Sequence, residues 1–590
     1  MRKKSFLATT ALEEFWDTSM HMVFLGPWCK KYSRKHVWEK TDHETLVSPL
    51  SDQKNMCEAY NLTSAVYKHI LKETACALNS IHGEDHGNRY WEIIIGPWIF
   101  HYIDVMYDRY ISIKTFLDTD IPFSAATVCE TSIITPLTTD EFVALSLKDE
   151  FNHQIYSRII DILYPNDFTK KPCKGSASPG HKSLAKTGFK DRVKEVLNFF
   201  LSIDVKGGRQ KLATKSAYFP YLAMKKIIAS AKHNMLELKD IPLDGIEADR
   251  DAAVRKQLVI KANSSGEFTD LLRQLIPLDI PMSYIENYKA FKNAAERLPK
   301  SGAVFSSNSW YFDELFKIWA ADRMEQGAIL IGAQHGGNYG SDLFMRHEDF
   351  ELGIVDKFYS WGWDREEYSD KIIPFYANTL TGNKEYGSDN SQKGVLLISA
   401  ATPRYLYRIN VINNHHVEDY IAWQMRFAAS LSKARTKELK IRLFPADFGC
   451  DHKMRLNDSF PEVALEDKTI PFLASVICAR IVVCDHLSTP LTDVLSANKP
   501  TIIFWDPKVQ LIRSEAQPFY DALHSAGILY YSPEDAAKAV ETIYDDVEKW
   551  WNEPGRKKAV ALFCNQFART SKDSVKAWAE EFKKIISEIK

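Results

Sequence analysis

The sequence lacks a hydrophobic run long enough to cross a bilayer. Its most apolar window, residues 90–107, is interrupted by Glu92, His101 and Asp104, whereas a spanning helix needs about 20 predominantly apolar residues. The short apolar stretch near the first residue ends at Glu13, which is too early for a signal peptide. We therefore expect a cytoplasmic protein that touches the inner face of the inner membrane only peripherally.

Several chemical signatures are also missing. The nine cysteines form no C-x-x-C pair, which argues against a zinc or thioredoxin-type centre and suits a reducing compartment. Walker A, G-x-S-x-G and H-E-x-x-H motifs are absent. The D-x-D pattern Asp118-Thr-Asp120 lacks a clear preceding buried strand, so we expect no metal and no cofactor. With a net charge of −2, the protein has no overall field that attracts nucleic acid.

The chain is long and rich in aromatic side chains. Its 590 residues exceed what one hydrophobic core usually supports, so at least two domains are expected. Aromatic residues make up 12% of the sequence and include 14 tryptophans. Their rings could stack on the C–H faces of sugars, or they could simply fill a large core.

Short apolar runs alternate with helical segments from residue 301 onward, which predicts parallel, doubly wound sheets. Strands are expected at residues 303–305, 328–331, 395–399, 441–444, 480–483 and 501–504. We take the polar stretch 381–393 as a linker. The prediction is an α/β protein with a Rossmann-like domain at 1–380, carrying a helical and Lys-rich insertion at about 165–300, and a second one with terminal helices at 381–590.

A glycine-rich loop surrounds His335 directly after the strand expected at 328–331. Glycines allow a ligand to approach the backbone closely, and exposed N–H groups can cradle an anion. We therefore predict that Gln334, Gly336 and Gly337 contact a phosphate and that His335 donates a hydrogen bond or moves a proton. The alternative is a tight structural turn with an incidental histidine.

A second motif, Asp485-His-Leu-Ser-Thr-Pro490, stands between a strand and a helix. Hydroxyl groups before a proline are typical of a helix start, and helix N-termini bind phosphate. We predict that His486, Ser488 and Thr489 bind a nucleotide. Helix capping alone is the alternative.

Carboxylates and arginines complete the candidate set. Asp313 and Glu314 follow the strand at 303–305 and should share a sheet edge with His335, where they could act as nucleophile or base. N-capping or surface charge is the alternative. Arg89 and Arg109 stand near tryptophans and could clamp a carboxylate or phosphate, or form buried salt bridges. Glu348 and Glu351 share a helical face and are either supporting residues or plain surface.

Several motifs in order resemble a known family. They are Phe24–Cys29, Arg89–Trp91 with Gly96–Trp98, Asp108-Arg109, Phe316-Lys317, Gln334–Gly337 with Tyr339-Gly340, and Ser360–Trp363. The family comprises O-antigen and capsule transferases named from spirochaete surface-polysaccharide loci. The order is similar, more distantly, to the Kdo transferases of capsule synthesis, and one branch includes retaining pseudaminic acid transferases.

This resemblance implies a GT-B fold, with two Rossmann-like domains facing each other across a cleft. It also implies acceptor binding mainly in the first domain, a CMP-activated ulosonic acid donor held mainly by the second, and retention of anomeric configuration. Many GT-B proteins hold the nucleotide ribose with a glutamate in the helix after the Ser/Thr turn. Here that region offers Thr492-Asp493.

The expected mechanism places the CMP phosphate at the helix that starts near Ser488, with His335 stabilising the departing charge. Retention by double displacement needs a carboxylate nucleophile, for which Asp313 is the first candidate and Glu314 the reserve. We expect Arg404 to help bind the donor. The residues expected to bind sugar or acceptor are Arg89, Trp98, Arg109, Trp28, Lys317 and Glu348.

Two other functions stay open: a polyol-phosphate transferase that uses a CDP-linked donor, and a non-catalytic glycan-binding protein. The acceptor is expected to be a lipid-linked glycan of a capsule or O-antigen. Lysines cluster between Lys170 and Lys194. They could dock the enzyme on anionic lipid or belong to a solvated loop.

Overall fold

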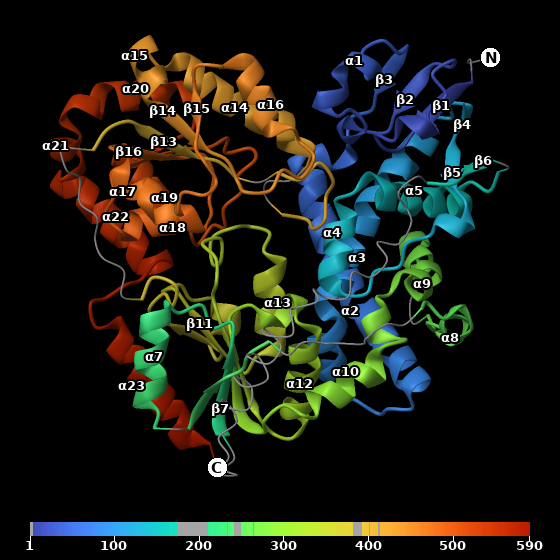
Figure 1. The fold of residues 1–590 in the computed structure, drawn as a ribbon, viewed down its shortest axis with the longest axis horizontal. Helices are drawn as coiled ribbons and strands as arrows, with labels where there is room; N and C mark the ends of the chain where they lie inside the picture. The colour runs from blue at the N-terminus through green and yellow to red at the C-terminus, as the bar shows by residue number, and fades with distance from the viewer. Residues whose placement is uncertain are drawn as a thin grey trace, which may run out of the picture.

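The computed structural model describes residues 4–166, 168–173, 210–232, 234–240, 249–262, 265–381, 392–400, 402–410 and 414–589. These residues form an α/β protein with three parallel sheets of four or six strands and one two-stranded ladder (Figure 1). Most of the Lys-rich cluster, from Lys174 to Lys194, and most of the expected linker, residues 382–391, lie outside the described residues.

The four-stranded sheet, here called the N-terminal sheet, has the order β3-β2-β1-β4. Its strands are β1 (Ser5–Ala8), β2 (Met22–Phe24), β3 (His43–Thr45) and β4 (Phe123–Ser124). The ladder beside it joins β5 (Ala126–Val128) to β6 (Thr169–Lys171).

The middle sheet has the order β12-β11-β10-β9-β7-β8, and all of its pairs are parallel. Its strands are β7 (Gln210–Lys215), β8 (Met235–Glu237), β9 (Ser301–Ser306), β10 (Ile329–Ala333), β11 (Lys357–Ser360) and β12 (Ile372–Pro374). Numbered along the chain, this order is 2-1-3-4-5-6, so the winding direction reverses between β7 and β9. Ligands of doubly wound sheets bind outside the carboxyl ends of the strands at such a point.

The C-terminal sheet has the order β15-β14-β13-β16-β17-β18 and is also fully parallel. Its strands are β13 (Val395–Ile398), β14 (Leu439–Arg442), β15 (Ala464–Leu465), β16 (Ile481–Cys484), β17 (Thr501–Phe504) and β18 (Leu529–Tyr530). This is the 3-2-1-4-5-6 order of the Rossmann fold, with its reversal between β13 and β16. Every residue of β13, β16 and β17 is buried, as expected for a parallel sheet covered on both faces.

Helices make up much of the rest. Those before the C-terminal sheet are α1 (Lys35–Trp38), α2 (Gln53–His82), α3 (Asn88–Leu117), α4 (Thr139–Ser146), α5 (Asp149–Leu163), α7 (Tyr221–Ser230), α8 (Ala252–Gln257), α9 (Glu267–Asp279), α10 (Tyr288–Ala295), α11 (Ser309–Phe312), α12 (Glu314–Glu325) and α13 (Arg346–Ile354). Those within or after it are α14 (Val417–Ser430), α15 (Lys433–Glu438), α16 (His452–Ser459), α17 (Phe472–Cys478), α18 (Thr489–Ser496), α19 (Gln517–Ser525), α20 (Pro533–Ile543), α21 (Val547–Trp551), α22 (Pro554–Phe567) and α23 (Ser574–Glu588).

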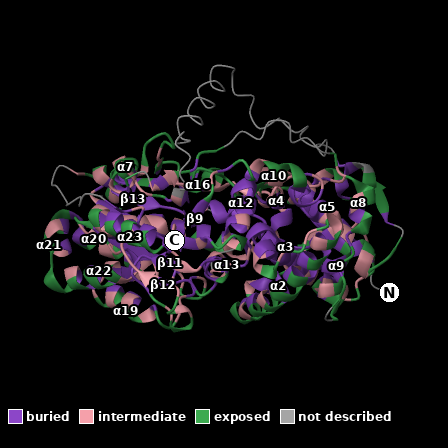
Figure 2. Ribbon diagram, turned by 90° about the horizontal axis from the view of Figure 1, so that it is seen from below, coloured by how far each residue is buried: buried purple, intermediate pink, exposed green. Residues whose placement is uncertain are grey.

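Helix α3 contains the apolar window 90–107 and is buried over most of its length (Figure 2). It packs against α2, α5, α12 and α13. Gly96 allows this approach, because a Cβ there would lie 2.8 Å from both the Tyr67 hydroxyl and the Phe350 ring. Within the described part of the chain, no helix combines the length and the hydropathy needed to span a membrane.

The last helix returns to the middle sheet. Trp578 and Phe582 of α23 pack on Phe305 of β9, with ring centroids 6.0 and 5.0 Å apart. The predicted α/β fold, with two Rossmann-like parallel sheets and C-terminal helices, is confirmed. The return of α23 to the middle sheet is an addition that the sequence did not indicate.

Candidate functional site

The loop after β10 touches the start of α18, so the carboxyl edges of the middle and C-terminal sheets meet. The Gly337 amide donates a hydrogen bond to Thr489 Oγ1 over 3.1 Å, and Asn338 Nδ2 donates to the Leu487 carbonyl over 3.0 Å. A Cβ on Gly337 would lie 2.6 Å from the Ser488 carbonyl oxygen. Glycine is therefore required for this approach, and two motifs 150 residues apart in the sequence form one site.

His335 lies in this loop with its side chain 16% exposed. Its Nδ1 is 3.1 Å from the Tyr339 hydroxyl and 3.5 Å from Glu351 Oε1. Burial, reinforced by the nearby charge of Arg408, lowers the pKa of His335 to about 3. The ring is therefore neutral at physiological pH, with one nitrogen as a hydrogen-bond donor and the other as an acceptor.

Glu351, on α13, is completely buried beside His335. Burial raises its pKa well above the usual range despite the neighbouring hydroxyls of Tyr311 and Tyr339. Burial therefore favours the protonated form of this carboxyl group, which lies beside the imidazole with which it could exchange a proton. The alternative reading of Glu351 as plain surface is wrong, because none of its side chain reaches solvent.

Asp485, His486 and Ser488 form a hydrogen-bonded chain after β16, at the reversal point of the C-terminal sheet. His486 Nδ1 lies 2.6 Å from Asp485 Oδ1, and the Ser488 hydroxyl lies 2.7 Å from His486 Nε2. The Tyr420 hydroxyl donates to Asp485 over 2.8 Å. Because the carboxylate orients the imidazole, Ser488 is held by His486 and does not cap α18.

Arg408 is a residue of this site that the sequence analysis missed. Its Nη1 donates to His347 Nδ1 over 2.7 Å, and its buried Nε has no acceptor. No carboxylate among the described residues forms an ion pair with it. A half-buried guanidinium without a counter-charge, close enough to lower the pKa of His335, is suited to bind an anion. The sequence signal was available, since Arg408 follows the first strand of a Rossmann-like sheet.

The two candidate nucleophiles have different surroundings. Asp313 caps α12 by accepting from the Phe316 amide over 2.9 Å and forms an ion pair with Lys215. Lys215 stands opposite Ser306 in the β7–β9 pairing, so Asp313 lies at the reversal point of the middle sheet, with its side chain 24% exposed.

Glu314 is buried and fully engaged. It accepts from the Thr139 amide over 2.8 Å and the Tyr284 hydroxyl over 2.7 Å, and it forms an ion pair of 2.6 Å with Lys317. Burial lowers the pKa of Lys317. Glu314 and Lys317 therefore neutralise each other inside the protein. The structure does not bring them to the His335 loop.

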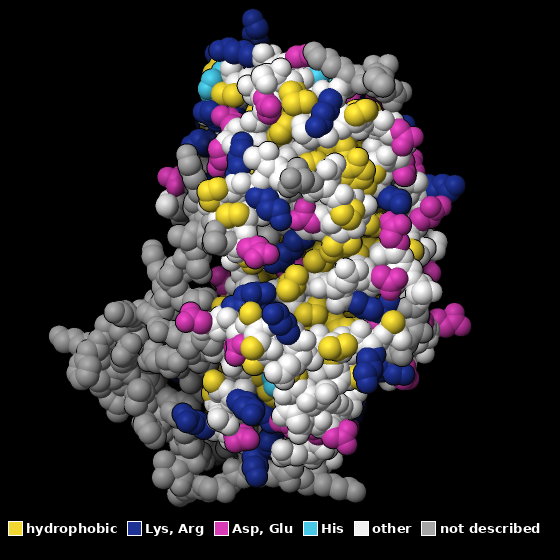
Figure 3. Space-filling model, turned by 90° about the vertical axis from the view of Figure 1, so that its right-hand side faces the viewer, with side chains coloured by type: hydrophobic (Ala, Val, Ile, Leu, Met, Phe, Trp, Pro, Cys, Tyr) yellow, Lys and Arg dark blue, Asp and Glu magenta, His cyan; other side chains and the backbone are white. Residues whose placement is uncertain are grey.

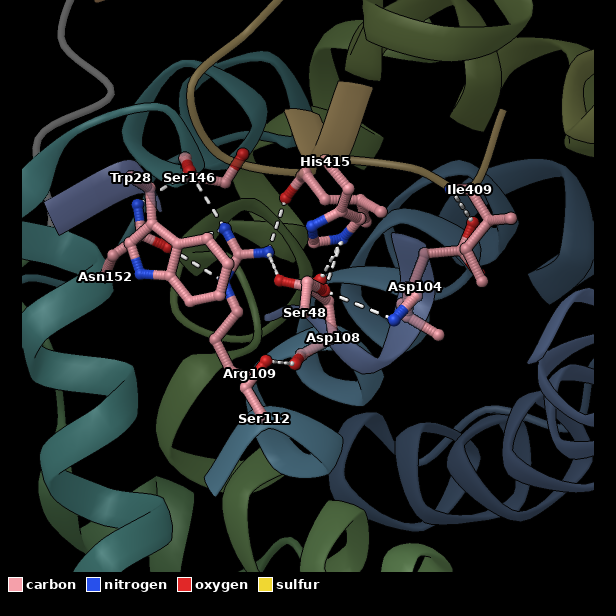
Figure 4. Close-up of polar contacts among 12 residues, drawn as sticks. Trp28, Ser48, Asp104, Asp108, Arg109, Ser112, Ser146, Asn152, Ile409 and His415 are labelled. Carbon is pink, nitrogen blue, oxygen red and sulfur yellow. Dashed lines mark hydrogen bonds and ion pairs between the residues drawn. The ribbon is translucent and has the colours of Figure 1, made fainter. Parts of the chain in front are cut away.

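The predicted sugar-binding arginines also have protein partners. Arg89 donates to the Ile354 carbonyl and to Asp356, holding the end of α13. Arg109 is buried and pairs with Asp108 over 2.8 Å, while Asp108 also contacts His415 Nε2 over 2.9 Å (Figure 4). These bonds tie α3 to the segment that follows β13.

Of the other five predicted residues, Gln334 and Glu348 support the loop after β10, whereas Trp98, Arg404 and Trp28 lie away from it. Gln334 accepts from the Trp361 amide and the Trp363 indole. Glu348 accepts from the Gly340 amide over 2.6 Å and pairs with two arginines. Trp98 is in the core beside Tyr102. Arg404 donates to the Trp28 carbonyl, and both residues line a separate cavity of about 180 Å³ with His415 and Arg455.

At this site two Rossmann-like sheet edges meet. It contains a neutral histidine, a buried carboxyl group, an arginine that forms no ion pair with a described residue, and a helix N-terminus. Among the residues that the structure describes, no group of three or more His, Cys, Asp or Glu side chains could hold a metal ion. Such an arrangement can bind an anionic group and move protons.

Fold and site together define an α/β protein with a site suited to an anionic ligand. The profile of the LIC12162 family of transferases matches residues 5–582, so the chain belongs to this family. The resemblance seen in the motifs is thereby confirmed at the level of a transferase family. No curated protein matches the chain.

Solved structures show distant likenesses. TarM is 13% identical with a TM-score of 0.31, over 48% of this chain and 54% of TarM. The UDP-GlcNAc 2-epimerase from Neisseria meningitidis is 14% identical with a TM-score of 0.35, over 63% of this chain and 100% of the epimerase. WaaG, a glycosyltransferase involved in lipopolysaccharide biosynthesis, is 11% identical with a TM-score of 0.29, over 64% of this chain and 100% of WaaG.

Proposed function

We propose that this protein is a GT-B-type glycosyltransferase that transfers an ulosonic acid from a CMP-sugar to a capsule or O-antigen glycan. The observation that carries the proposal is the contact between Gly337 and Thr489. It joins a glycine-rich histidine loop to a helix N-terminus, at the carboxyl edges of two Rossmann-like sheets. A nucleotide sugar bound there would have its phosphate at the start of α18.

Arg408 supports an acidic sugar as the donor. An ulosonic acid carries a carboxylate beside the anomeric carbon, and the Arg408 guanidinium, which forms no ion pair with a described residue, offers it a cation. The sequence analysis gave this role to Arg89 and Arg109. Arg109 is instead held by Asp108 and Asn152, and Arg89 by the Ile354 carbonyl and Asp356. We therefore assign the carboxylate contact to Arg408.

In the proposed reaction, neutral His335 donates a hydrogen bond to the phosphate oxygen on which charge develops as the CMP–sugar bond breaks. Protonated Glu351 can replace the proton that His335 gives up. Asp313 attacks the anomeric carbon as its bond to the CMP phosphate breaks, and a glycosyl–enzyme ester forms while CMP leaves. The acceptor hydroxyl then displaces the carboxylate and passes its proton through His335 back to Glu351, which gives net retention. The acceptor would bind on the side of residues 1–380, and the donor mainly within 381–590.

Incubation of the protein with CMP-pseudaminic acid, CMP-Kdo or CMP-sialic acid tests the proposal by the CMP that is released. We expect release from one of the three to accelerate when a glycan acceptor is added. Asp313→Asn should still bind CMP but lose turnover, and mass spectrometry of the native protein with donor alone should find a sugar adduct on the peptide containing Asp313.

Turnover with a CDP-polyol alone would favour the polyol-phosphate transferase. Glycan binding without turnover of any donor would favour a non-catalytic protein. An adduct on another residue, or full activity in Asp313→Asn, would remove Asp313 as the nucleophile while leaving the donor assignment intact.

A further inference from the structure

A cavity of about 630 Å³ lies in the N-terminal half of the protein. Helices α5 and α8, the end of α9 and the β5–β6 ladder form its walls. None of its lining residues belongs to a strand of the middle or C-terminal sheet. Its volume is in the range of small-molecule sites, and Ile133, Leu258 and Pro277 give it the apolar wall typical of them.

Positive charge exceeds negative charge around this cavity. Its lining includes five basic side chains, Arg158, Lys170, Arg250, Arg255 and Lys256, and two acidic ones, Glu130 and Asp161. Arg255 is neutralised by Glu286 over 2.6 Å, and Arg158 by Asp279. Arg250, Lys170 and Lys256 form no ion pair with any residue that the structure describes.

Two guanidinium N–H groups of residues that line this cavity have no acceptor among the described residues. They are Nη2 of Arg158 and Nε of Arg250, both buried. Burial, together with the charges of Arg255 and Arg158, lowers the pKa of Arg250. Buried donors of this kind are usually satisfied, so unpaired ones at a cavity indicate a missing acceptor.

The charge is local to the cavity. Helices α8 and α9 lie on the right-hand side of the molecule in Figure 1. Basic and acidic side chains are interspersed among the described residues of that face (Figure 3). A broad basic surface for a membrane or a nucleic acid would require a more uniform distribution. A small anionic ligand fits the observed one better.

We propose that this cavity binds a phosphorylated saccharide, with the phosphate on Arg158 and Arg250 and the saccharide against the apolar wall. A phosphate has three terminal oxygens and a charge near −2, so it can accept from two separate guanidinium groups and also meet Lys170 or Lys256. A carboxylate has two oxygens and one charge and would leave part of this set unpaired. The site is separate from the proposed donor cleft and does not depend on its chemistry.

Isothermal titration calorimetry of the full chain with glucose 1-phosphate, inorganic phosphate and glucuronate tests this site. We expect glucose 1-phosphate to bind most tightly, because it meets both the arginines and the apolar wall. Arg250→Gln should weaken its binding by about tenfold, since a charge-assisted hydrogen bond is lost. Arg250→Lys should retain part of the affinity.

The matched control is Arg426→Gln, which removes an exposed arginine paired with Glu534 and should leave binding unchanged. Arg250→Gln should unfold at the same temperature as the native protein, since it breaks no ion pair among the described residues. Three results would overturn the proposal: no binding of glucose 1-phosphate, equal affinity in Arg250→Gln, or glucuronate binding as tight as glucose 1-phosphate. Loss of binding in Ser488→Ala would also overturn it, by placing the ligand in the donor cleft.

Discussion

Arg109, on α3, and Arg408, in the segment after β13, differ in how completely their charges are neutralised. Arg109 is fully buried, and Asp108, Asn152 and the Leu406 carbonyl accept its hydrogen bonds. Burial raises the pKa of Asp108, but the charges and hydrogen bonds of Arg109 and His415 together hold that pKa below the usual value. Arg408, two residues after Leu406, has histidine neighbours and an unpaired buried N–H.

The difference separates an arginine that holds the fold from one that is ready for a ligand. A buried cation with full protein partners contributes to stability, and removing it leaves the partners unpaired. A half-buried cation without a counter-charge keeps its binding capacity. Residue type does not distinguish the two, because both are arginines near aromatic rings.

The largest effect expected is on stability, in Arg109→Ala. This change leaves Asp108 buried without its main partner, and we expect it to lower the free energy of unfolding by about 3–5 kcal/mol. Guanidinium unfolding followed by fluorescence would measure it, with Arg426→Ala as an exposed control. Native stability in Arg109→Ala would show that Arg109 does not hold the fold.

Arg408→Ala should reduce turnover but leave stability nearly unchanged. We expect its stability to change by less than about 1 kcal/mol. Turnover of the CMP-sugar should fall by about 100-fold, or roughly 2.7 kcal/mol, because the sugar carboxylate loses its cation. Steady-state CMP release, with Arg408→Lys retaining part of the rate, would sharpen the contrast. Full turnover in Arg408→Ala would contradict it.

His335→Gln should change how stability depends on pH. The folded pKa of about 3 lies below the ordinary value of 6.5. Between these values the unfolded chain binds a proton that the folded chain does not, so the free energy of unfolding falls as the pH falls through this window. We expect the variant to lose about 2 kcal/mol less than the native protein at about pH 5. The measurement is the free energy of unfolding as a function of pH, and the control is His36→Gln, which changes an exposed histidine. If the curves of the His335→Gln variant and the native protein run parallel, His335 is not buried as described.

The smallest effect expected is in Ser488→Ala. We expect CMP to bind about fivefold more weakly, because one neutral hydroxyl contact is lost. Thr489 is a poorer test, since its Oγ1 also accepts from Gly337. Calorimetry with CMP measures the change, and unaltered affinity would place the nucleotide elsewhere.

Local pattern predicted much of the architecture. Strands near 395–398 and 501–504 and the start of α18 at Thr489 follow from hydrophobic runs and helix-start residues, which are properties of neighbouring positions. Because strand ends share an edge in a parallel sheet, the placement of His335 and Asp313 at carboxyl ends could also be predicted. The sequence alone therefore determined the fold class and the loops in which a site could form.

Only the tertiary structure decided which charged residues are neutralised by a protein partner. Asp108 meets His415 across 307 positions, and Glu314 meets the Thr139 amide across 175. No local pattern predicts such contacts, because they depend on which distant segments share the interior. Burial and pairing then set whether a carboxyl group is ionised, as for Glu351, or whether an arginine is neutralised, as for Arg109 but not Arg408.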